Sequence, residues 1–337
     1  MKFLPIFSTG KVKLNFPCLM LLCVLLFLFS ALLSLLLGSS SLSLGAILYP
    51  DDSVRRILVH VRLPRTLAAA LAGMALAASG TIIQTVMDNP LAGPNLIGVN
   101  AGAGLAAVLC TAFLPAIPGA MATGAFLGAL SALLLIYAVA KATGASRTTL
   151  ILSGVAVSSI LSAGIDAVVT LVPDALMGVS AFRIGSLQTV ALNRLPLPAV
   201  YILFALILTL SLCNEMDVLA LGDETAQTLG LNTKRYRFLL LLAASMLSGS
   251  AVSFCGLLGF VGLIVPHAAR FLTDCCECKK LLSVSTLLGG SFVILCDVLA
   301  RVLFAPYEIP VGIVMSFLGG PFFLWLLIRR KGGKSHD

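Results

Sequence analysis

GLLGFVGLIVPHAAR, residues 256–270, is the stretch that decides the fold of this chain. It is apolar enough to lie in a membrane, yet it contains three glycines, a proline, a histidine and an arginine. An inert anchor helix has no use for these residue types, whereas broken, glycine-spaced helices inside a bilayer are typical of proteins that move a solute across it. We therefore expect Gly259, Gly262 and Pro266 to lie along a transport pathway or its gate.

The composition places most of the chain in lipid. The chain has 337 residues, of which 59% are hydrophobic and 11% are charged. A soluble domain carries roughly 25% charged residues, so we expect a polytopic membrane protein. The net charge of +8 is compatible with nucleic acid binding, but the basic residues are scattered between apolar runs and are better explained by membrane orientation. A lipid membrane is the expected partner, and nucleic acid is not.

Apolar runs of spanning length predict an all-α fold of about ten transmembrane helices in a single domain, residues 1–337. The first run is too long for the core of a signal peptide and lacks a clean small-residue cleavage site, so a retained span is expected. The expected helices cover residues 16–37, 64–86, 95–113, 119–140, 148–171, 196–213, 237–257, 259–272, 281–303 and 311–328.

The basic residues predict which helix ends face the cytoplasm. With the N-terminus inside, every lysine falls in a cytoplasmic segment, as the positive-inside rule requires. An even number of spans then returns the basic C-terminal tail to the cytoplasm. On this topology the second to fifth helices begin outside and the seventh to tenth begin inside, which is the relation expected of two inverted four-helix blocks.

Residues 214–236 form the longest cytoplasmic loop, and a short helix is expected inside it. Asp223 is a candidate cap, acidic residues favour the first turn, and Gly230 is a candidate terminator. Such a helix is expected to place Ala226 and Leu229 on one side. Two helical turns are not stable alone in water. The helix therefore needs a partner surface, which is either the rest of this chain or a separate cytoplasmic subunit.

An arginine cluster stands in the first outer loop and at the start of the second helix. Arg55, Arg56, Arg62 and Arg65 lie within eleven residues without a lysine among them, and Arg301 is expected at the outer end of the ninth helix. Such arginines either reach to lipid phosphates or bind the carboxylates of an acidic partner outside. Arginine pairs with a carboxylate through two parallel hydrogen bonds, which lysine cannot do, and this favours docking.

The spans offer little material for other chemistry. Asp166 and Asp297 are the only acids within them, and both are expected near outer ends, so a proton relay at the midplane is not supported. Cys275 and Cys278 form one C-x-x-C pair without a second pair or well-placed histidines, so no metal site is predicted. The tail contains GGKS, but Ile328 stands where a phosphate-binding loop needs its first glycine. We expect a transport subunit and not an enzyme.

Five blocks occur in order between about Arg62 and Arg330, and together they are a far more specific signal than any one alone. They are RLPR at 62–65, NPLAGP at 89–94, the pair of LG dipeptides at 221–222 and 229–230, GFVGLIVPH at 259–267, and EIPVG at 308–312 followed by GPFFLW at 320–325. On these blocks the chain resembles the FecCD-type permeases, the membrane subunits of ABC importers for iron–siderophores, haem and vitamin B12.

The resemblance implies a type II ABC importer permease in the cytoplasmic membrane of a prokaryote, with both termini in the cytoplasm and no cofactor. It implies two permease subunits, identical or paralogous, a cytoplasmic ATPase dimer and an extracytoplasmic substrate-binding protein. Arg62, Arg65 and Arg301 fall where such permeases pair with carboxylates of the binding protein, and Arg55 and Arg56 are candidates by position only. The implied ATPase-coupling residues are Gly222, Asp223, Glu224, Thr225, Ala226, Leu229 and Gly230.

Two departures from the family pattern bear on the cargo. Arg183, close to Gly185 in the outer segment 172–195, stands in a block where the family commonly has tryptophan before apolar residues. It makes the expected pathway mouth more basic, which suits an anionic chelate. The loop after Arg270 holds cysteines where the family usually has an Asp-His or similar pair. The expected cargo is an iron–siderophore, with haem or cobalamin as alternatives. An ion-driven secondary transporter is the rival from another class, but the paired midplane sites that it requires are not found.

Overall fold

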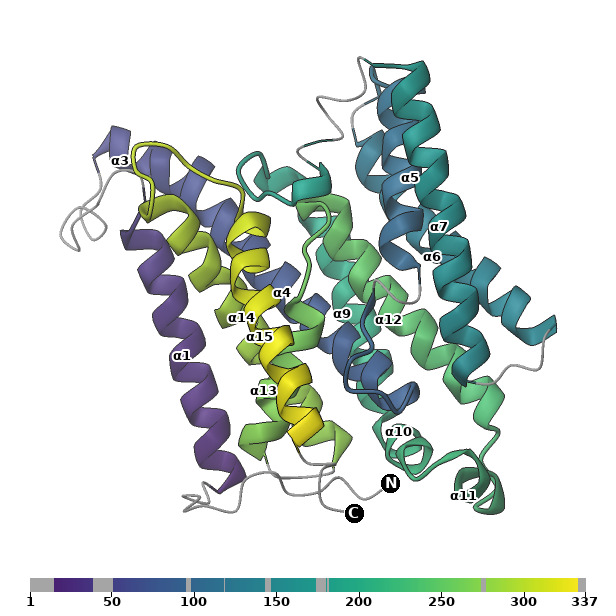
Figure 1. The fold of residues 1–337 in the computed structure, drawn as a ribbon. Helices are drawn as coiled ribbons and strands as arrows, with labels where there is room; N and C mark the ends of the chain where they lie inside the picture. The colour runs from purple at the N-terminus through teal and green to yellow at the C-terminus, as the bar shows by residue number, and fades with distance from the viewer. Residues whose placement is uncertain are drawn as a thin grey trace.

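The computed structural model describes residues 15–38, 51–94, 98–117, 119–142, 147–173, 180, 182–273 and 277–332. Within these ranges every regular element is a helix, and the helices form one bundle (Figure 1). The elements are α1 (Phe16–Leu36), α3 (Asp52–Ile57), the π-helical segment η1 (Leu58–Arg62), α4 (Leu63–Val86), α5 (Val99–Phe113), α6 (Ala120–Ala142), α7 (Arg147–Leu171), the 3-10 turn η3 (Leu192–Arg194), α9 (Pro196–Ser211), α10 (Cys213–Ala220), α11 (Asp223–Thr228), α12 (Thr233–Cys255), α13 (Val261–Thr273), α14 (Cys278–Val302) and α15 (Val311–Gly332).

The all-α polytopic architecture is confirmed. Among the described residues, six helices are long and apolar enough to cross a membrane, three shorter ones are apolar, and α9 with α10 forms a span bent by 59°. The sixth expected helix, 196–213, corresponds to α9, whereas α10 falls almost entirely within the expected loop 214–236 and was not predicted. The residues at the start of the third expected helix, 95–97, lie outside the described ranges, and α5 begins at Val99.

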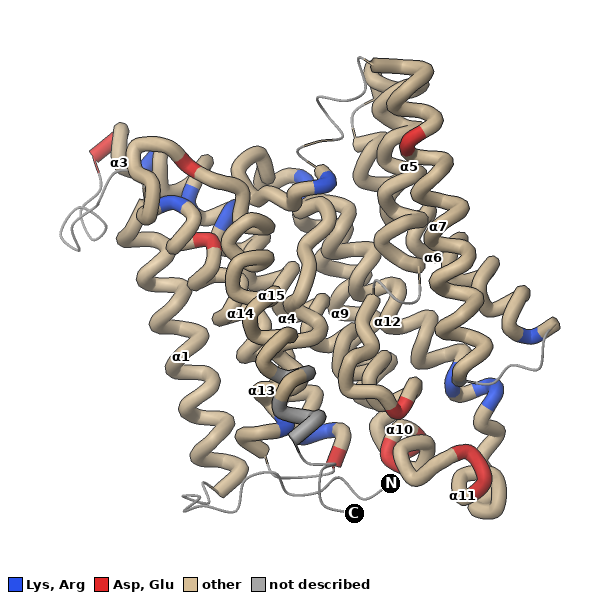
Figure 2. The backbone as a smooth tube through the Cα atoms, in the orientation of Figure 1, with Lys and Arg blue, Asp and Glu red and all other residues tan. Residues whose placement is uncertain are grey.

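Charged residues lie toward the two ends of the bundle, and the middle is almost free of them in the described part of the chain (Figure 2). This distribution is what a bilayer requires, since a charge in the hydrocarbon layer is costly. Figure 1 shows α10 and α11 at one end, which we call the α11 end, and α3 at the opposite end, which we call the α3 end. The start of α4 and the end of α14 lie at the α3 end.

Helix α4 is the centre of the bundle, and small residues let its neighbours approach it closely. A Cβ atom built on Gly73 would stand 2.1 Å from the carbonyl oxygen of Gly289 in α14. One built on Gly80 would stand 1.9 Å from the carbonyl oxygen of Gly262 in α13. Interfaces of this kind allow helices to pack backbone against backbone, as membrane helices do in the absence of a hydrophobic driving force.

Gly80→Ala is therefore expected to destabilise the bundle by about 1–3 kcal/mol, because the added methyl group forces α4 and α13 apart. The matched control is Gly320→Ala in α15, where a Cβ meets nothing within 4 Å. Because alanine favours a helix over glycine, the control is expected to be neutral or slightly stabilising. Thermal unfolding of the two purified variants in the same detergent checks the difference, and equal melting temperatures would contradict the close packing.

Candidate functional site

The segment between α9 and α12 folds back under the bundle at the α11 end. Cys213, Met216 and Leu219 occupy one face of α10 and are all buried. Gly222 then turns the chain with a φ of 104°, a conformation that side-chain-bearing residues avoid, and serves as the N-cap of α11. The sequence prediction that Asp223 caps this helix is wrong, because Asp223 is its first residue and the cap has no side chain to offer.

Helix α11 is fastened to the bundle through two contacts. Ala226 is fully buried in the main core, and Asp223 Oδ1 forms an ion pair of 2.5 Å with Nη2 of Arg237 in α12. The helix ends at Thr228, and Gly230, with a φ of 83°, follows the C-cap Leu229. The N–H of Leu231 then donates to the carbonyl oxygen of Ala226 at 3.0 Å. The rest of this chain is thus one partner of the short helix, which was one of the two alternatives that the sequence left open.

Exposed leucines stand just before and just after α11. Leu221 and Leu229 are 61% and 63% exposed, and they flank the exposed residues Glu224 and Thr225. The expectation that Leu229 shares a side with Ala226 is wrong, since Leu229 lies past the end of the helix and faces outward. Two large apolar side chains beside charged residues at a bundle end mark a surface that suits a protein partner. We call Leu221, Glu224, Thr225 and Leu229 the α11 surface.

A carboxylate on α10 ties this segment to a second long helix. Asp217 Oδ1 accepts a hydrogen bond of 2.8 Å from the N–H of Cys278, the first residue of α14. The N-cap residue of α14, Glu277, makes no such side-chain bond, so Asp217 satisfies a helix N-terminus from another part of the chain. Through Asp217 and Arg237 the α11 surface is joined to α14 and α12, both of which pack on α4.

At the α3 end, two buried arginines, the buried Asp297 and the partly exposed Glu308 form a cluster around Arg65. Its Nε lies 2.9 Å from Asp297 Oδ1 of α14, and its Nη1 lies 2.5 Å from Glu308 Oε2 in the loop before α15. Asp297 Oδ2 also pairs with Nη2 of Arg301 at 3.1 Å. Arg65, Asp297 and Arg301 are all at most 4% exposed. The two carboxylates balance the two guanidinium groups, as buried charges require. We call these four residues the buried ion cluster.

Arg62 and the cluster residue Arg301 complete the last turn of α1. Arg62 Nη1 donates to the carbonyl oxygens of Leu35 and Leu36 at 2.5 and 2.8 Å. Arg301 Nη1 donates to the carbonyl oxygen of Ser34 at 3.2 Å, and its Nη2 donates to the Ser34 hydroxyl at 2.6 Å. The last carbonyls of a helix lack partners within it, and α1 has no basic residue of its own in its last turn. Arginines of η1 and α14 supply these hydrogen bonds.

These contacts show where the structure places three arginines of the docking prediction, which itself stays a prediction. Arg62, Arg65 and Arg301 are buried, and their guanidinium groups bond to α1, Asp297 and Glu308 within this chain, so they are not presented to a partner in this structure. Arg55 and Arg56 lie on α3 and are exposed. Their docking role stays a prediction.

Helix α3 is held at its start by Asp51. Its carboxylate accepts hydrogen bonds from the N–H of Val54 at 2.8 Å and the hydroxyl of Ser53 at 2.9 Å. These two bonds, the Val54 bond foremost, lower the pKa of Asp51 below its ordinary value. The N-cap is therefore charged at neutral pH, where it favours the helix that carries Arg55 and Arg56.

Residues 256–260, between α12 and α13, form a break in the bundle. Gly256 and Phe260 both have positive φ values, 72° and 66°, between the end of α12 and the start of α13. Residues from the outer segment fill the break: the N–H of Leu257 donates to the carbonyl oxygen of Phe182 at 2.9 Å, and the N–H of Ser186 donates to that of Cys255 at 2.9 Å. Irregular backbone at membrane depth is tolerated only where protein satisfies it in this way.

Gly185 joins this break to the start of α15. It has a φ of 80°, and its carbonyl oxygen accepts a hydrogen bond of 3.1 Å from the N–H of Gly312. A Cβ at Gly185 would stand 2.6 Å from Leu258 Cδ2. Arg183 is half exposed, and its Nη1 lies 3.9 Å from Oδ1 of the exposed Asp166. The structure therefore brings Gly185 to the α12–α13 break, and it leaves Arg183 on the surface.

Pro266 explains a hydrogen bond that sequence reasoning missed. Proline has no N–H, so within α13 the carbonyl oxygen of Gly262, four residues earlier, loses its helical partner. Gln84 of α4 replaces that partner, because its Nε2 donates to Gly262 O at 3.2 Å. Arg270 Nη1 in turn donates to Gln84 Oε1, which orients the amide. The spacing of Gly262 and Pro266 signals the unpaired carbonyl, but nothing in the sequence pairs it with a residue 178 positions away.

A polytopic helical bundle with a broken central region and a helical segment at one end has the architecture of a type II ABC importer permease. The sequence profile of the FecCD transport family matches residues 25–329, and the chain belongs to this family.

The relatives and a solved structure agree with this assignment. The chain is 36% identical to the hemin transport system permease protein HmuU of Yersinia pestis, over 97% of this chain and 99% of that protein. It is 35% identical to the Fe(3+)-citrate import system permease protein YfmE of Bacillus subtilis, over 95% and 97% of the two chains. A solved structure described as an inward-facing conformation of a metal-chelate type ABC transporter superposes with a TM-score of 0.85 at 30% identity, over 93% of this chain and 99% of that one. This chain is thus a multi-pass permease of an ABC importer.

Proposed function

We propose that this chain carries an iron–siderophore or a similar iron chelate across the cytoplasmic membrane, driven by ATP hydrolysis in a separate subunit. The observation that carries the proposal is the agreement of full-length relatives: one is a hemin permease and another an Fe(3+)-citrate permease. The solved transporter of similar fold is of the metal-chelate type. Haem is the alternative cargo that a relative's name favours, and cobalamin and an ion-driven mechanism remain as rivals from the sequence.

The α11 end is the proposed cytoplasmic end, with both termini on that side. A cytoplasmic ATPase dimer binds the α11 surface of two permease subunits, which are copies of this chain or paralogues. Gly222 and Gly230 bound the coupling helix, and Asp223 and Ala226 anchor it to the bundle. This coupling role is supported by Asp217 and Arg237, which connect the segment to α14 and α12. A displacement of α11 therefore moves the helices around α4.

The α3 end is the proposed extracytoplasmic end, where a substrate-binding protein delivers the chelate. The α12–α13 break with Gly259, Gly262 and Pro266, and the adjoining Gly185 and Arg183, form the proposed pathway and gate. Hydrogen bonds from other segments support the break: Leu257 and Ser186 link it to the outer segment, Gln84 donates to Gly262, and Gly312 donates to Gly185. Breaks of this kind supply hinges for rigid-body movements that alternate access.

Reversing the charges of Arg55 and Arg56 tests the docking site. The double variant Arg55→Glu, Arg56→Glu is expected to weaken binding of an acidic binding protein about 10-fold or more, mainly through slower association that depends on salt. Surface plasmon resonance with the complex in nanodiscs measures it. Asp52→Asn, on the same helix, is the control and is expected to bind at least as well. Unchanged affinity and salt dependence of the double variant would move docking away from α3.

The experiment that tests the whole proposal is uptake into proteoliposomes. The chain is purified from its native membrane with its co-purifying subunits and reconstituted, and uptake of ferric siderophore, ferric citrate, haem and cobalamin is measured with and without ATP. ATP-dependent uptake of a ferric chelate is the expected result. Uptake of haem or cobalamin alone would reassign the cargo. Uptake by the isolated chain without ATP, driven by an ion gradient, would overturn the ABC mechanism.

A further inference from the structure

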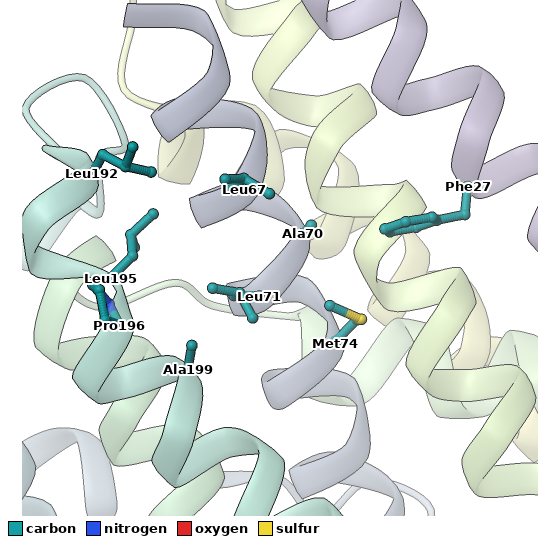
Figure 3. Close-up of a pocket in the computed structure, with 9 residues that line it drawn as sticks. All are labelled: Phe27, Leu67, Ala70, Leu71, Met74, Leu192, Leu195, Pro196 and Ala199. Atoms are coloured by element: carbon teal, nitrogen blue, oxygen red, sulfur yellow. The ribbon is translucent and has the colours of Figure 1, made fainter. Parts of the chain in front are cut away.

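A groove on the flank of the bundle is lined only by apolar side chains. Helix α4 forms its floor with Leu67, Leu71 and neighbouring residues, while η3 and α9 form one wall and α1 contributes Phe27 to the other. Figure 3 shows Leu192 and Ala199 on one side, Phe27 on the other, and the α4 side chains between them. Its volume is about 380 Å³, within the range of about 300–1,000 Å³ that ligand pockets occupy.

The groove lies in the half of the membrane on the α3 side. It begins beside η3 and the first turns of α4, and it reaches Met74. Leu67 and Met74 are seven residues apart, or roughly 10 Å along the helix, while one leaflet of hydrocarbon is about 15 Å thick. The groove thus runs from the interface toward the midplane, parallel to the acyl chains of a single leaflet.

An exposed arginine stands between two lining residues at this end of the groove. Arg194 is the last residue of η3, between the lining residues Leu192 and Leu195, and it is exposed. An arginine at the membrane interface is positioned to bind a lipid phosphate, and its aliphatic stem covers the apolar surface below it. The groove is apolar and about as deep as one leaflet, which suits an acyl chain. The arginine at its interfacial end suits the phosphate of the same phospholipid.

We propose that this groove is a binding site for one phospholipid, whose acyl chain lies between α1 and α9 on α4 and whose phosphate pairs with Arg194. The site is independent of the cargo and of the ATPase, because it touches neither the α12–α13 break nor the α11 surface. Its occupant covers the floor of the groove, where α4 would otherwise leave packing space unfilled. Bound lipid therefore acts as a structural ligand that fixes α1 and α9 relative to the central helix.

Photolabelling of the full-length chain tests the proposal. The chain is placed in nanodiscs that contain a phosphatidylglycerol with a photoreactive group on one acyl chain, and adducts are mapped by mass spectrometry. Labels are expected to concentrate on peptides that contain Phe27, Leu71 and Met74. Ala199→Trp, which fills the groove, is expected to lower this labelling about tenfold. The matched control Val200→Trp, at the neighbouring exposed position of α9, is expected to leave it unchanged.

Two further variants complete the photolabelling test. Leu67→Trp fills the mouth from α4 at a residue that is 41% exposed, and it replaces Ala199→Trp if that variant does not elute as a folded protein. Arg194→Gln is expected to lower labelling by phosphatidylglycerol about fivefold. Labelling spread evenly over α1 and α6, or groove labelling that survives both tryptophan variants, would overturn the site. A photoreactive residue at position 199 that captures a second copy of the chain would do the same.

Discussion

Asp297→Ala is expected to destabilise this permease by about 3–5 kcal/mol, the cost of leaving buried charges unpaired. Asp297 is fully buried, and its two carboxylate oxygens bond to Arg65 and Arg301. Its removal leaves one carboxylate, Glu308, to balance both guanidinium groups. The hydrogen bonds from Arg301 to the last turn of α1 are expected to weaken as well, because that guanidinium group loses its anchor. Denaturation of the purified variant in mixed micelles measures the effect.

The matched control is Asp166→Ala in α7. Asp166 is the other acid within the predicted spans, but its side chain is 72% exposed and its ion pair with Arg183 is 3.9 Å long. Exposed pairs contribute about 0–1 kcal/mol, so the control is expected to unfold close to wild type. The triple variant Arg65→Met, Asp297→Leu, Arg301→Met removes the three most buried charges of the cluster together, leaves only the partly exposed Glu308, and is expected to recover part of the loss. If Asp297→Ala and Asp166→Ala unfold alike, the buried ion cluster does not stabilise the bundle.

Most of the fold could be predicted, because helix length and apolar content are local properties. The run at 16–37 became α1, Phe16–Leu36, and the run at 311–328 became the start of α15. The bend after Ser211 was not predicted, since no proline or glycine marks it. The relation between two inverted four-helix blocks stays a prediction.

The candidate site was predictable only where its signal is local. The coupling segment between Gly222 and Gly230 carries its own turn residues, and the structure places a helix there. The buried ion cluster was not predicted as a unit, because Arg65 and Asp297 are 232 residues apart. The spacing of the arginines indicated a docking surface that faces outward. In the structure, three of the guanidinium groups face the interior of the bundle instead. Composition gives the number of charges but does not say which of them pair.

Leu221→Asp with Leu229→Asp is expected to abolish ATP-driven uptake while leaving the permease folded. The side chains of both leucines are more than 60% exposed, at 61% and 63%, so their replacement removes little packing within this chain. At the proposed ATPase interface each leucine would bury its side chain, and interface residues that anchor binding contribute about 2 kcal/mol each. Each single variant is therefore expected to weaken ATPase binding roughly 30-fold, as measured by co-purification and by affinity in nanodiscs.

Conservative variants separate recognition from folding. Leu221→Met with Leu229→Met keeps apolar side chains of similar size and is expected to retain ATPase binding and uptake. Thermal unfolding of the aspartate variants should match wild type, since Ala226 and the Asp223–Arg237 ion pair, which hold α11 to the bundle, are untouched. Loss of uptake with normal ATPase binding would place these leucines in the coupling step and not in recognition. Full uptake by the double aspartate variant would show that the ATPase binds another part of the α11 end.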